Sequence, residues 1–274
     1  MNLFEAIVLG IVQGVTEFLP ISSTAHLRIV PAMAGWDDPG AAFTAVTQLG
    51  TMSAVLIYFW ADLRRILRAW VRSLRDRSAR ADLDARLGWY IILGTIPIGA
   101  FGLAFKSQIE TGARNLTLIA STLIVLGLVL LAAERVGTRA RPLAAITRRD
   151  GLSIGLAQAV ALIPGVSRSG ATITAGLFAG LTREAAARFS FLLSLPAVVL
   201  SGLLELGSIM RGDAGGTIGA APLLTATVVA FVVGYGSIAV LMRYLSRHST
   251  MVFVVYRVGL GAIVLALVGV GVIE

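Results

Sequence analysis

Long apolar runs separated by short polar segments organise this chain. Six runs, built mainly from Leu, Val, Ile, Ala and Gly, are each long enough for a helix to cross the hydrocarbon core of a bilayer. A membrane β-strand needs only about ten residues of alternating polarity, so the pattern favours helices. We therefore expect an all-α polytopic membrane protein with six transmembrane helices. The predicted spans are about 43 to 60, 89 to 105, 115 to 133, 189 to 207, 221 to 242 and 250 to 273.

Two further apolar runs are shorter, and a proline ends each of them. The run 3 to 19 ends in "FLPISS", and the run 152 to 163 ends in "LIPGVSRSG". Neither is expected to cross a bilayer alone. We predict two re-entrant helix hairpins here, at 3 to 34 and 151 to 180, each entering and leaving on one side of the membrane.

Composition supports a membrane location and excludes several kinds of site. Of the 274 residues 57% are hydrophobic and 14% charged, and the mean hydropathy is +0.86. The absence of cysteine excludes disulfides, thiol chemistry and Cys-ligated metal sites, and two histidines are too few for a His-rich metal site. The net charge of +8 is almost entirely arginine, which in a membrane protein indicates cytoplasmic loops rather than a nucleic-acid partner.

Arginines in the polar segments predict the orientation. The segment 61 to 88 contains eight arginines and 134 to 149 contains five, so both should face the cytoplasm, as should the link 242 to 249. The segments with few positive charges, expected outside with the C-terminus, are 31 to 42, 106 to 114 and 208 to 220. On this topology the first hairpin enters from outside and the second from inside.

An internal repeat supports these oppositely oriented hairpins. The stretch "LGIVQGV" resembles "IGLAQAV", with Gln13 aligned to Gln158. Each unit continues into a proline, a Ser-rich turn and three spans, and an odd number of spans requires inverted topology. Chance similarity between apolar helices is the alternative. The predicted organisation is one membrane domain, 1 to 274, with inverted repeats at about 1 to 133 and 150 to 274.

The first hairpin carries an acid at predicted membrane depth. Glu17 follows Gln13 by four residues, so both share one helix face. A buried charge costs about 2.5 kcal/mol or more on insertion scales unless it meets water, a cation or a partner. Solvation of Glu17 near the outer surface is the alternative to a functional role.

Polar residues after Pro20 continue the same hairpin. Ser22, Ser23 and Thr24 are suitable N-caps for a following helix, whose free N–H groups would bind an anion. His26 lies in the first turn of that helix. Alone it would be an interfacial histidine, but beside Glu17 and Ser23 it indicates acid–base chemistry.

The second hairpin supplies a cation in the stretch "PGVSRSGAT". Arg168 offers a fixed fork of donors suited to phosphate oxygens, and Ser167, Ser169 and Thr172 add hydroxyls. A capped helix break with one snorkelling arginine is the alternative. If the two tips meet, they form an anion-binding, phosphate-handling pocket with its own base and candidate nucleophile.

The two motifs "QGVTEFLPISSTAH" and "PGVSRSGAT" resemble the signature regions of the undecaprenyl-diphosphate phosphatase family of the bacitracin-resistance type. The resemblance covers essentially the whole chain, including "FSFLLSLP" at 189 to 196. It implies a bacterial inner-membrane enzyme that hydrolyses undecaprenyl diphosphate to undecaprenyl phosphate and phosphate. Such an enzyme recycles the lipid carrier of cell-wall synthesis, confers bacitracin resistance and has a site open to the outer, periplasmic face.

The resemblance also implies roles for individual residues. Gln13 and Glu17 correspond to the family's Glu/Gln-x-x-x-Glu pair, and Ser23 and His26 to its catalytic serine and histidine. The phosphate-binding motif falls on Ser167, Arg168 and Thr172. Family members are helped by Mg²⁺ or Ca²⁺; because position 13 is a glutamine, an ion would bridge Glu17 and the diphosphate.

Two other classes of function remain open from the sequence. A transporter or flippase of a phosphorylated polyprenyl lipid would use the same inverted-repeat site, but it needs no base or nucleophile. A structural membrane scaffold would leave Glu17 and Arg168 unexplained. The nucleophile, whether Ser23, His26 or water, and a homodimeric state are also left open.

Overall fold

The computed structural model describes residues 1–105, 115–211 and 219–273, and these residues form helices and turns without an extended strand. Six of the described helices are long and apolar enough to cross a membrane, which confirms the predicted spans. The predicted outer loop 106 to 114 and most of 208 to 220 lie outside the described residues. The six helices are α3 (Gly40–Tyr58), α5 (Leu83–Ala104), α7 (Leu116–Val136), α10 (Arg183–Arg211), α11 (Ala220–Leu245) and α12 (Met251–Gly269).

The arginine-rich segment 61 to 88, expected as a loop, is largely helical. It contains α4 (Trp60–Arg75) and the short 3-10 helix η1 (Ser78–Ala81). Asp82 then caps α5 by accepting a hydrogen bond from the backbone N–H of Asp84, so α5 begins at Leu83, earlier than predicted. A search for uniformly apolar runs overlooks α4, because its apolar residues recur at helical spacing among arginines.

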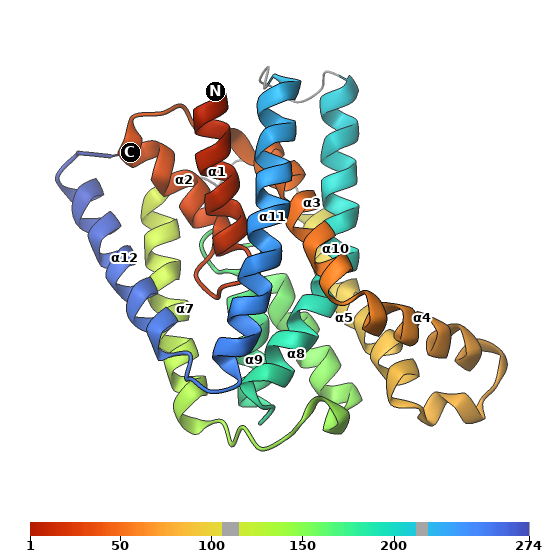
Figure 1. The fold of residues 1–274 in the computed structure, drawn as a ribbon. Coiled ribbons are helices and arrows are strands. Elements are labelled where there is room, and N and C mark those ends of the chain that lie inside the picture. The colour runs from red at the N-terminus through yellow and green to blue at the C-terminus, as the bar shows by residue number, and fades with distance from the viewer. Residues whose placement is uncertain (106–114, 212–218, 274) are drawn as a thin grey trace.

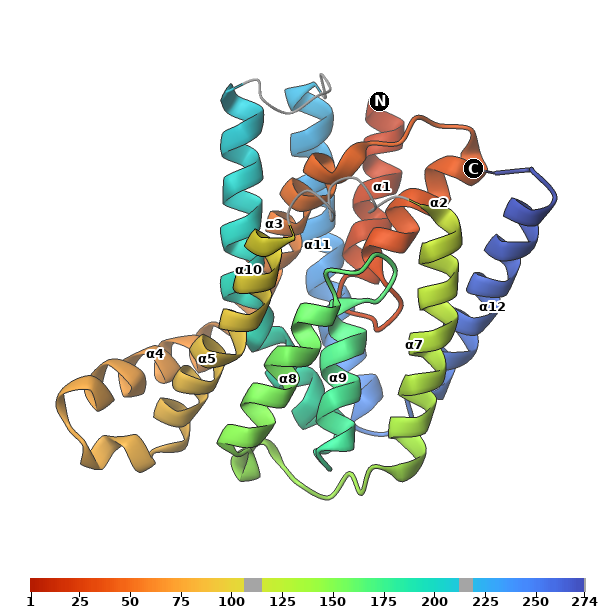
Figure 2. The same ribbon diagram turned by 180° about the vertical axis from the view of Figure 1, so that it is seen from behind.

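Two pairs of shorter helices enter the bundle from opposite ends (Figures 1 and 2). The first pair is α1 (Leu3–Thr16) and α2 (Ser23–Ala34), and the second is α8 (Arg148–Val160) and α9 (Arg168–Phe178). Their turns meet in the middle of the molecule. This arrangement is consistent with the predicted re-entrant hairpins, whose position relative to a membrane stays a prediction.

Both hairpins begin with the same helix-capping motif. Asn2 and Glu5 form a capping box at the start of α1, and Thr147 and Asp150 form one at the start of α8. A capping box satisfies backbone N–H groups that have no partner inside the helix. Each hairpin therefore has a well-defined first helix that starts at an opposite end of the bundle.

The packing of these first helices is similar in the two halves. Helix α1 lies along α11 and α8 lies along α5 (Figure 1). The aligned glycines Gly10 and Gly155 are at the closest approaches: a Cβ would lie 2.7 Å from the Ala226 carbonyl oxygen at Gly10, and 2.4 Å from Gly94 Cα at Gly155. The same contact in both halves is consistent with the predicted inverted repeat.

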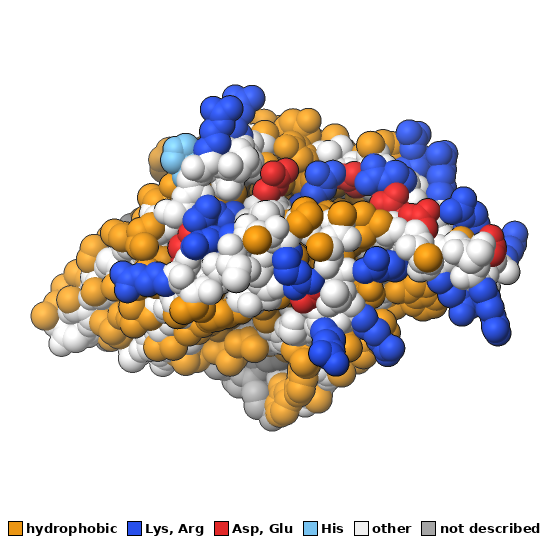
Figure 3. Space-filling model, turned by 90° about the horizontal axis from the view of Figure 1, so that it is seen from below, with side chains coloured by type: hydrophobic (Ala, Val, Ile, Leu, Met, Phe, Trp, Pro, Cys, Tyr) orange, Lys and Arg blue, Asp and Glu red, His pale blue; other side chains and the backbone are white. Residues whose placement is uncertain are grey.

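Glu134 lies near the C-terminal end of α7, the end that is lowest in Figure 1, and it connects three helices. Its carboxylate accepts hydrogen bonds from Arg183 Nε at 2.9 Å and from Thr250 Oγ1 at 2.8 Å, so the end of α7 is tied to the starts of α10 and α12. Arginines surround this end of the molecule (Figure 3). The three segments predicted to share one side of the membrane do lie at one end of the bundle (Figure 1).

Replacing Gly155 with alanine should destabilise the protein. The new methyl group would meet the backbone of Gly94, which cannot move aside, and overpacking of this kind costs about 1 to 3 kcal/mol. The thermal unfolding midpoint of the purified protein in detergent should fall. Gly99→Ala is the control, because a Cβ at Gly99 has no heavy atom within 4 Å; equal midpoints for the two variants would contradict the packing argument.

Candidate active site

Glu17 is the centre of the polar cluster at the hairpin tips. It is 7% exposed and lies where α1 ends. One carboxylate oxygen accepts hydrogen bonds from Ser23 Oγ at 2.6 Å and Gln13 Nε2 at 3.0 Å. The other forms an ion pair with Arg168 of the second hairpin. The cluster therefore brings together four of the predicted site residues, from both hairpins.

The two turns before α2 and α9 have the same unusual backbone. Ser22 and Ser167 are the N-caps of these helices, with φ values of 73° and 69°. Left-handed backbone is costly for any residue except glycine, and such strain concentrates at functional sites. Both helices begin at these turns, in the middle of the bundle. The first-turn N–H groups that have no acceptor inside the helix therefore lie there as well, and they favour an anion.

Ser169 joins the second turn to the first. Its hydroxyl donates to the Leu19 carbonyl at 3.0 Å and lies 3.2 Å from Ser167 Oγ. A hydroxyl shared in this way cannot turn freely toward a ligand. Ser169 and Ser167 therefore shape the turns in the described structure.

His26 is buried and contacts a residue that the sequence analysis did not include. Its Nδ1 lies 2.7 Å from the Ser22 carbonyl, which can only accept, so Nδ1 carries a proton. Its Nε2 lies 2.7 Å from the Tyr256 hydroxyl, and the two rings are stacked. The histidine tautomer is therefore fixed, leaving Nε2 as an acceptor when the ring is neutral.

Arg257, next to Tyr256 on α12, was also missed, and it connects the two tips. It is completely buried. Its guanidinium donates to the Pro20 carbonyl in the first turn and to the Val166 carbonyl in the second, both at 3.1 Å. Its Nε donates to the Leu123 carbonyl of α7 at 3.2 Å. An arginine in the first third of the apolar run 250 to 273 gives no sequence signal that it reaches two distant turns.

Two predicted residues, Thr24 and Thr172, make no hydrogen bond to Glu17 or to the Arg168 guanidinium among the described residues. Thr24 is exposed, with its hydroxyl 3.1 Å from Ser22 Oγ. Thr172 is fully buried, and its hydroxyl donates to the Arg168 carbonyl at 2.8 Å and lies 2.6 Å from Ser190 Oγ of α10. A direct role of either residue in binding phosphate stays a prediction.

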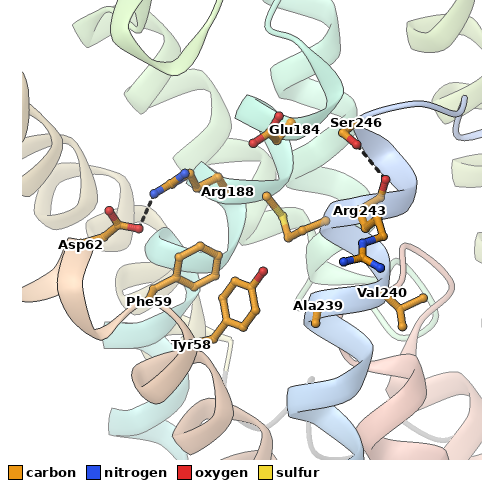
Figure 4. A pocket seen from close by; sticks show the side chains of 10 residues that line it. Tyr58, Phe59, Asp62, Glu184, Arg188, Ala239, Val240, Arg243 and Ser246 are labelled. Atoms are coloured by element: carbon orange, nitrogen blue, oxygen red, sulfur yellow. Dashed lines mark hydrogen bonds and ion pairs between the residues drawn. The ribbon is translucent and has the colours of Figure 1, made fainter.

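A cavity of about 750 Å³ lies elsewhere, at the lower end of the bundle. Figure 4 shows Arg188 paired with Asp62 on one side and Arg243 on the other, with Phe59 and Tyr58 between them. None of the predicted site residues lines it. The candidate active site is therefore the hairpin tips rather than this cavity.

Comparison with known proteins gives the family. A family model described as bacitracin resistance protein BacA matches residues 6–263. The chain belongs to the BacA family. With its six apolar helices it is a multi-pass membrane protein.

Relatives of this BacA-family chain have one activity in their names. It is 56% identical to undecaprenyl-diphosphatase 3 of Frankia alni, over all of this chain and 97% of the relative. It is 55% identical to undecaprenyl-diphosphatase of Mycolicibacterium smegmatis and 53% identical to undecaprenyl-diphosphatase 2 of Streptomyces coelicolor. Both of these alignments also cover all of this chain, with 99% and 97% of the relatives.

The BacA-family site offers few groups for a metal. Among the described residues no three His, Cys, Asp or Glu side chains are grouped to hold an ion. Glu17 and Gln13 nevertheless provide oxygen donors, and Gln13 Oε1 is buried without a hydrogen-bond partner. Mg²⁺ and Ca²⁺ prefer oxygen ligands, and Mg²⁺ usually takes several of them from water and substrate phosphates. The residues fit such an ion only if a substrate supplies further ligands.

Removing the Arg257 side-chain charge should destabilise the contact between the two hairpin turns. Arg257→Met leaves buried carbonyls in both turns unpaired, at about 1 to 3 kcal/mol for each. The thermal unfolding midpoint in detergent should fall by several degrees. Arg243→Met is a matched control, because Arg243 is exposed and its guanidinium has no hydrogen-bond partner in the described residues. A midpoint unchanged in Arg257→Met would show that the tips do not depend on this residue.

Proposed function

We propose that this protein hydrolyses undecaprenyl diphosphate to undecaprenyl phosphate and inorganic phosphate. The single observation that carries the proposal is the Ser23–Glu17–Arg168 cluster, in which a hydroxyl, its base and a cation meet at two helix N-termini. The BacA-family match and the names of the relatives support it. The reaction recycles a lipid carrier of cell-wall synthesis, which accounts for the link to bacitracin resistance in the family's description.

The geometry supports Ser23 as the nucleophile. Its hydroxyl already donates to Glu17, so the carboxylate can take the proton as Oγ attacks the terminal phosphorus. The bond from that phosphorus to the bridging oxygen breaks, and undecaprenyl phosphate leaves. Once Glu17 has released this proton to water, another water attacks the phosphoserine with Glu17 as base. The bond from Ser23 Oγ to phosphorus breaks, Oγ takes the proton back from Glu17, and phosphate leaves. Attack by His26 or directly by water would differ in leaving no phosphate on Ser23.

Arg168 and the two helix N-termini stabilise negative charge in this scheme. The guanidinium would share its donors between Glu17 and the phosphate oxygens, which develop charge in the transition state. His26 holds the Ser22 turn through its Nδ1 proton. In the neutral ring Nε2 accepts from the Tyr256 hydroxyl, so it is the imidazolium form, with a proton on Nε2 as well, that can pass a proton through this hydroxyl to the leaving group.

We propose a divalent cation, Mg²⁺ or Ca²⁺, as an aid to the reaction. When bound, such an ion neutralises diphosphate charge. Glu17 and Gln13 Oε1 would hold it together with the substrate, because this chain supplies too few ligands alone.

The proposed location is the bacterial cytoplasmic (inner) membrane, with the arginine-rich lower end of Figure 1 inside. The first hairpin then enters from the outer, periplasmic side. The diphosphate would reach the tips from that side, with its polyprenyl tail between helices.

Phosphate release from undecaprenyl or farnesyl diphosphate by the purified protein tests the proposal. Glu17→Gln and Ser23→Ala should each lower kcat by roughly 10² to 10⁴, since they remove the base and the nucleophile. Arg168→Lys should lose about 10² or more because lysine lacks the guanidinium fork. Glu5→Gln, Ser153→Ala and Arg243→Lys are matched controls away from the tips and should retain activity. Lipid binding without phosphate release by the wild type would favour the carrier function instead.

Cation dependence should respond to the residue at position 13. Gln13→Glu adds a carboxylate beside Glu17, so we expect half-maximal phosphate release at a roughly tenfold lower Mg²⁺ concentration than in the wild type. Gln13→Leu should shift it to higher concentrations. Activity that is unaffected by chelator in all three proteins would exclude a role for the ion.

A further inference from the structure

A helical arm leaves the bundle sideways near its lower end (Figures 1 and 2). It consists of α4, η1 and the first turns of α5, residues 60–88. The arm contains none of the active-site residues and does not line the hairpin tips. Its eight arginines make up a large share of the chain's positive charge.

One face of α4 holds the arm in a fixed shape. Ile66 and Ala69 are buried on this face, and Trp70 packs so closely that a Cβ at Gly88 of α5 would lie 2.8 Å from the Trp70 Cβ. Ion pairs from Arg65 to Asp84 at 2.6 Å and from Arg72 to Asp82 at 3.2 Å add to this contact. The orientation of the remaining faces of α4 is therefore set by the fold.

A second face of α4 exposes an apolar stripe. Trp60 is 60% exposed, Leu67 59%, Val71 42% and Leu74 48%. Their spacing places them in one line along the helix. Large apolar side chains exposed in one line along a helix indicate a surface that contacts lipid or another protein.

The third face, next to the stripe, is cationic. Arg64 and Arg68 line a cavity of about 450 Å³ together with the ion-paired Arg65 and Arg72. Within the described residues Arg64 and Arg68 have no hydrogen bond or ion pair of their own. The view from below shows arginines along the rim of the arm (Figure 3). Of the four arginines that line this cavity, Arg64 and Arg68 are thus left for an external anion.

We propose that the arm lies in the surface of the membrane, with its apolar stripe in the acyl boundary and Arg64 and Arg68 on the phosphates of anionic phospholipids. The position of the arm supports this partner: α4 follows α3 directly and leads into α5, so both ends are fixed to spanning helices. An amphipathic helix rich in arginine, with an aromatic residue in its apolar stripe, has the chemistry of an interfacial helix. A second copy of the chain would instead bring two arginine faces together.

A spin label can measure the depth of the arm in the intact protein. The chain has no cysteine, so Leu67→Cys and Ser78→Cys each give a single labelling site without background. Each full-length variant is placed in nanodiscs of phosphatidylcholine, with or without phosphatidylglycerol. The Leu67 label should collide more often with dissolved oxygen than with an aqueous nickel complex. This preference for oxygen should be larger in nanodiscs that contain phosphatidylglycerol. The Ser78 label at the exposed end of the arm should remain in the aqueous phase.

Charge variants test the lipid specificity. Arg64→Gln with Arg68→Gln should lower the ratio of inserted to aqueous label with phosphatidylglycerol by about fivefold for each arginine removed. Arg243→Gln with Arg247→Gln removes equal charge from the same end outside the arm and should leave that ratio unchanged. A Leu67 label as accessible to the nickel complex as the Ser78 label would overturn the proposal. The proposal would also be overturned if the Leu67 label were shielded from both oxygen and the nickel complex and its spectrum were broadened by a second nearby label. That result would mean that a second copy of the chain covers the stripe.

Discussion

The buried guanidinium of Arg257 is the interaction on which the centre of this molecule depends. Two chain reversals at the middle of a membrane bundle leave carbonyl groups without helical partners, in surroundings where water cannot reach them freely. Arg257 donates to one such carbonyl in each turn and to a third on α7. One side chain thereby satisfies a carbonyl acceptor in each of the two turns and fixes the distance between the turns.

The ion pair between Glu17 and Arg168 becomes possible once the turns are joined. Removing two charges from water is costly, and a buried pair of this kind is weak support for stability alone. Here the acid also accepts from Ser23 and Gln13, and the cation lies at the start of α9. The pair holds a carboxylate and a guanidinium close to a hydroxyl, which are the groups that a phosphate-handling site needs before its ligand arrives.

Much of this architecture could be predicted from the sequence, because burial in lipid imposes length and composition on each span. The breaks at Pro20 and Pro164, and the unusual polar residues beside them, located the candidate site. Tyr256 and Arg257 could not be predicted, since their role depends on how α12 packs against both turns. The sequence predicts a loop where α4 forms, because arginines interrupt the apolar residues that recur at helical spacing along it.

The shared backbone of the two turns has an evolutionary consequence. Ser22 and Ser167 occupy equivalent places after Gln13 and Gln158, so Ser23 and Arg168 are counterparts in the two halves. A symmetric pair of identical half-units would place the same group at both tips, either two hydroxyls or two cations. Joining the halves in one chain allows each tip to diverge separately. In this chain the two turns share one backbone conformation but place a hydroxyl at Ser23 and a cation at Arg168, so neither hairpin could supply both groups alone.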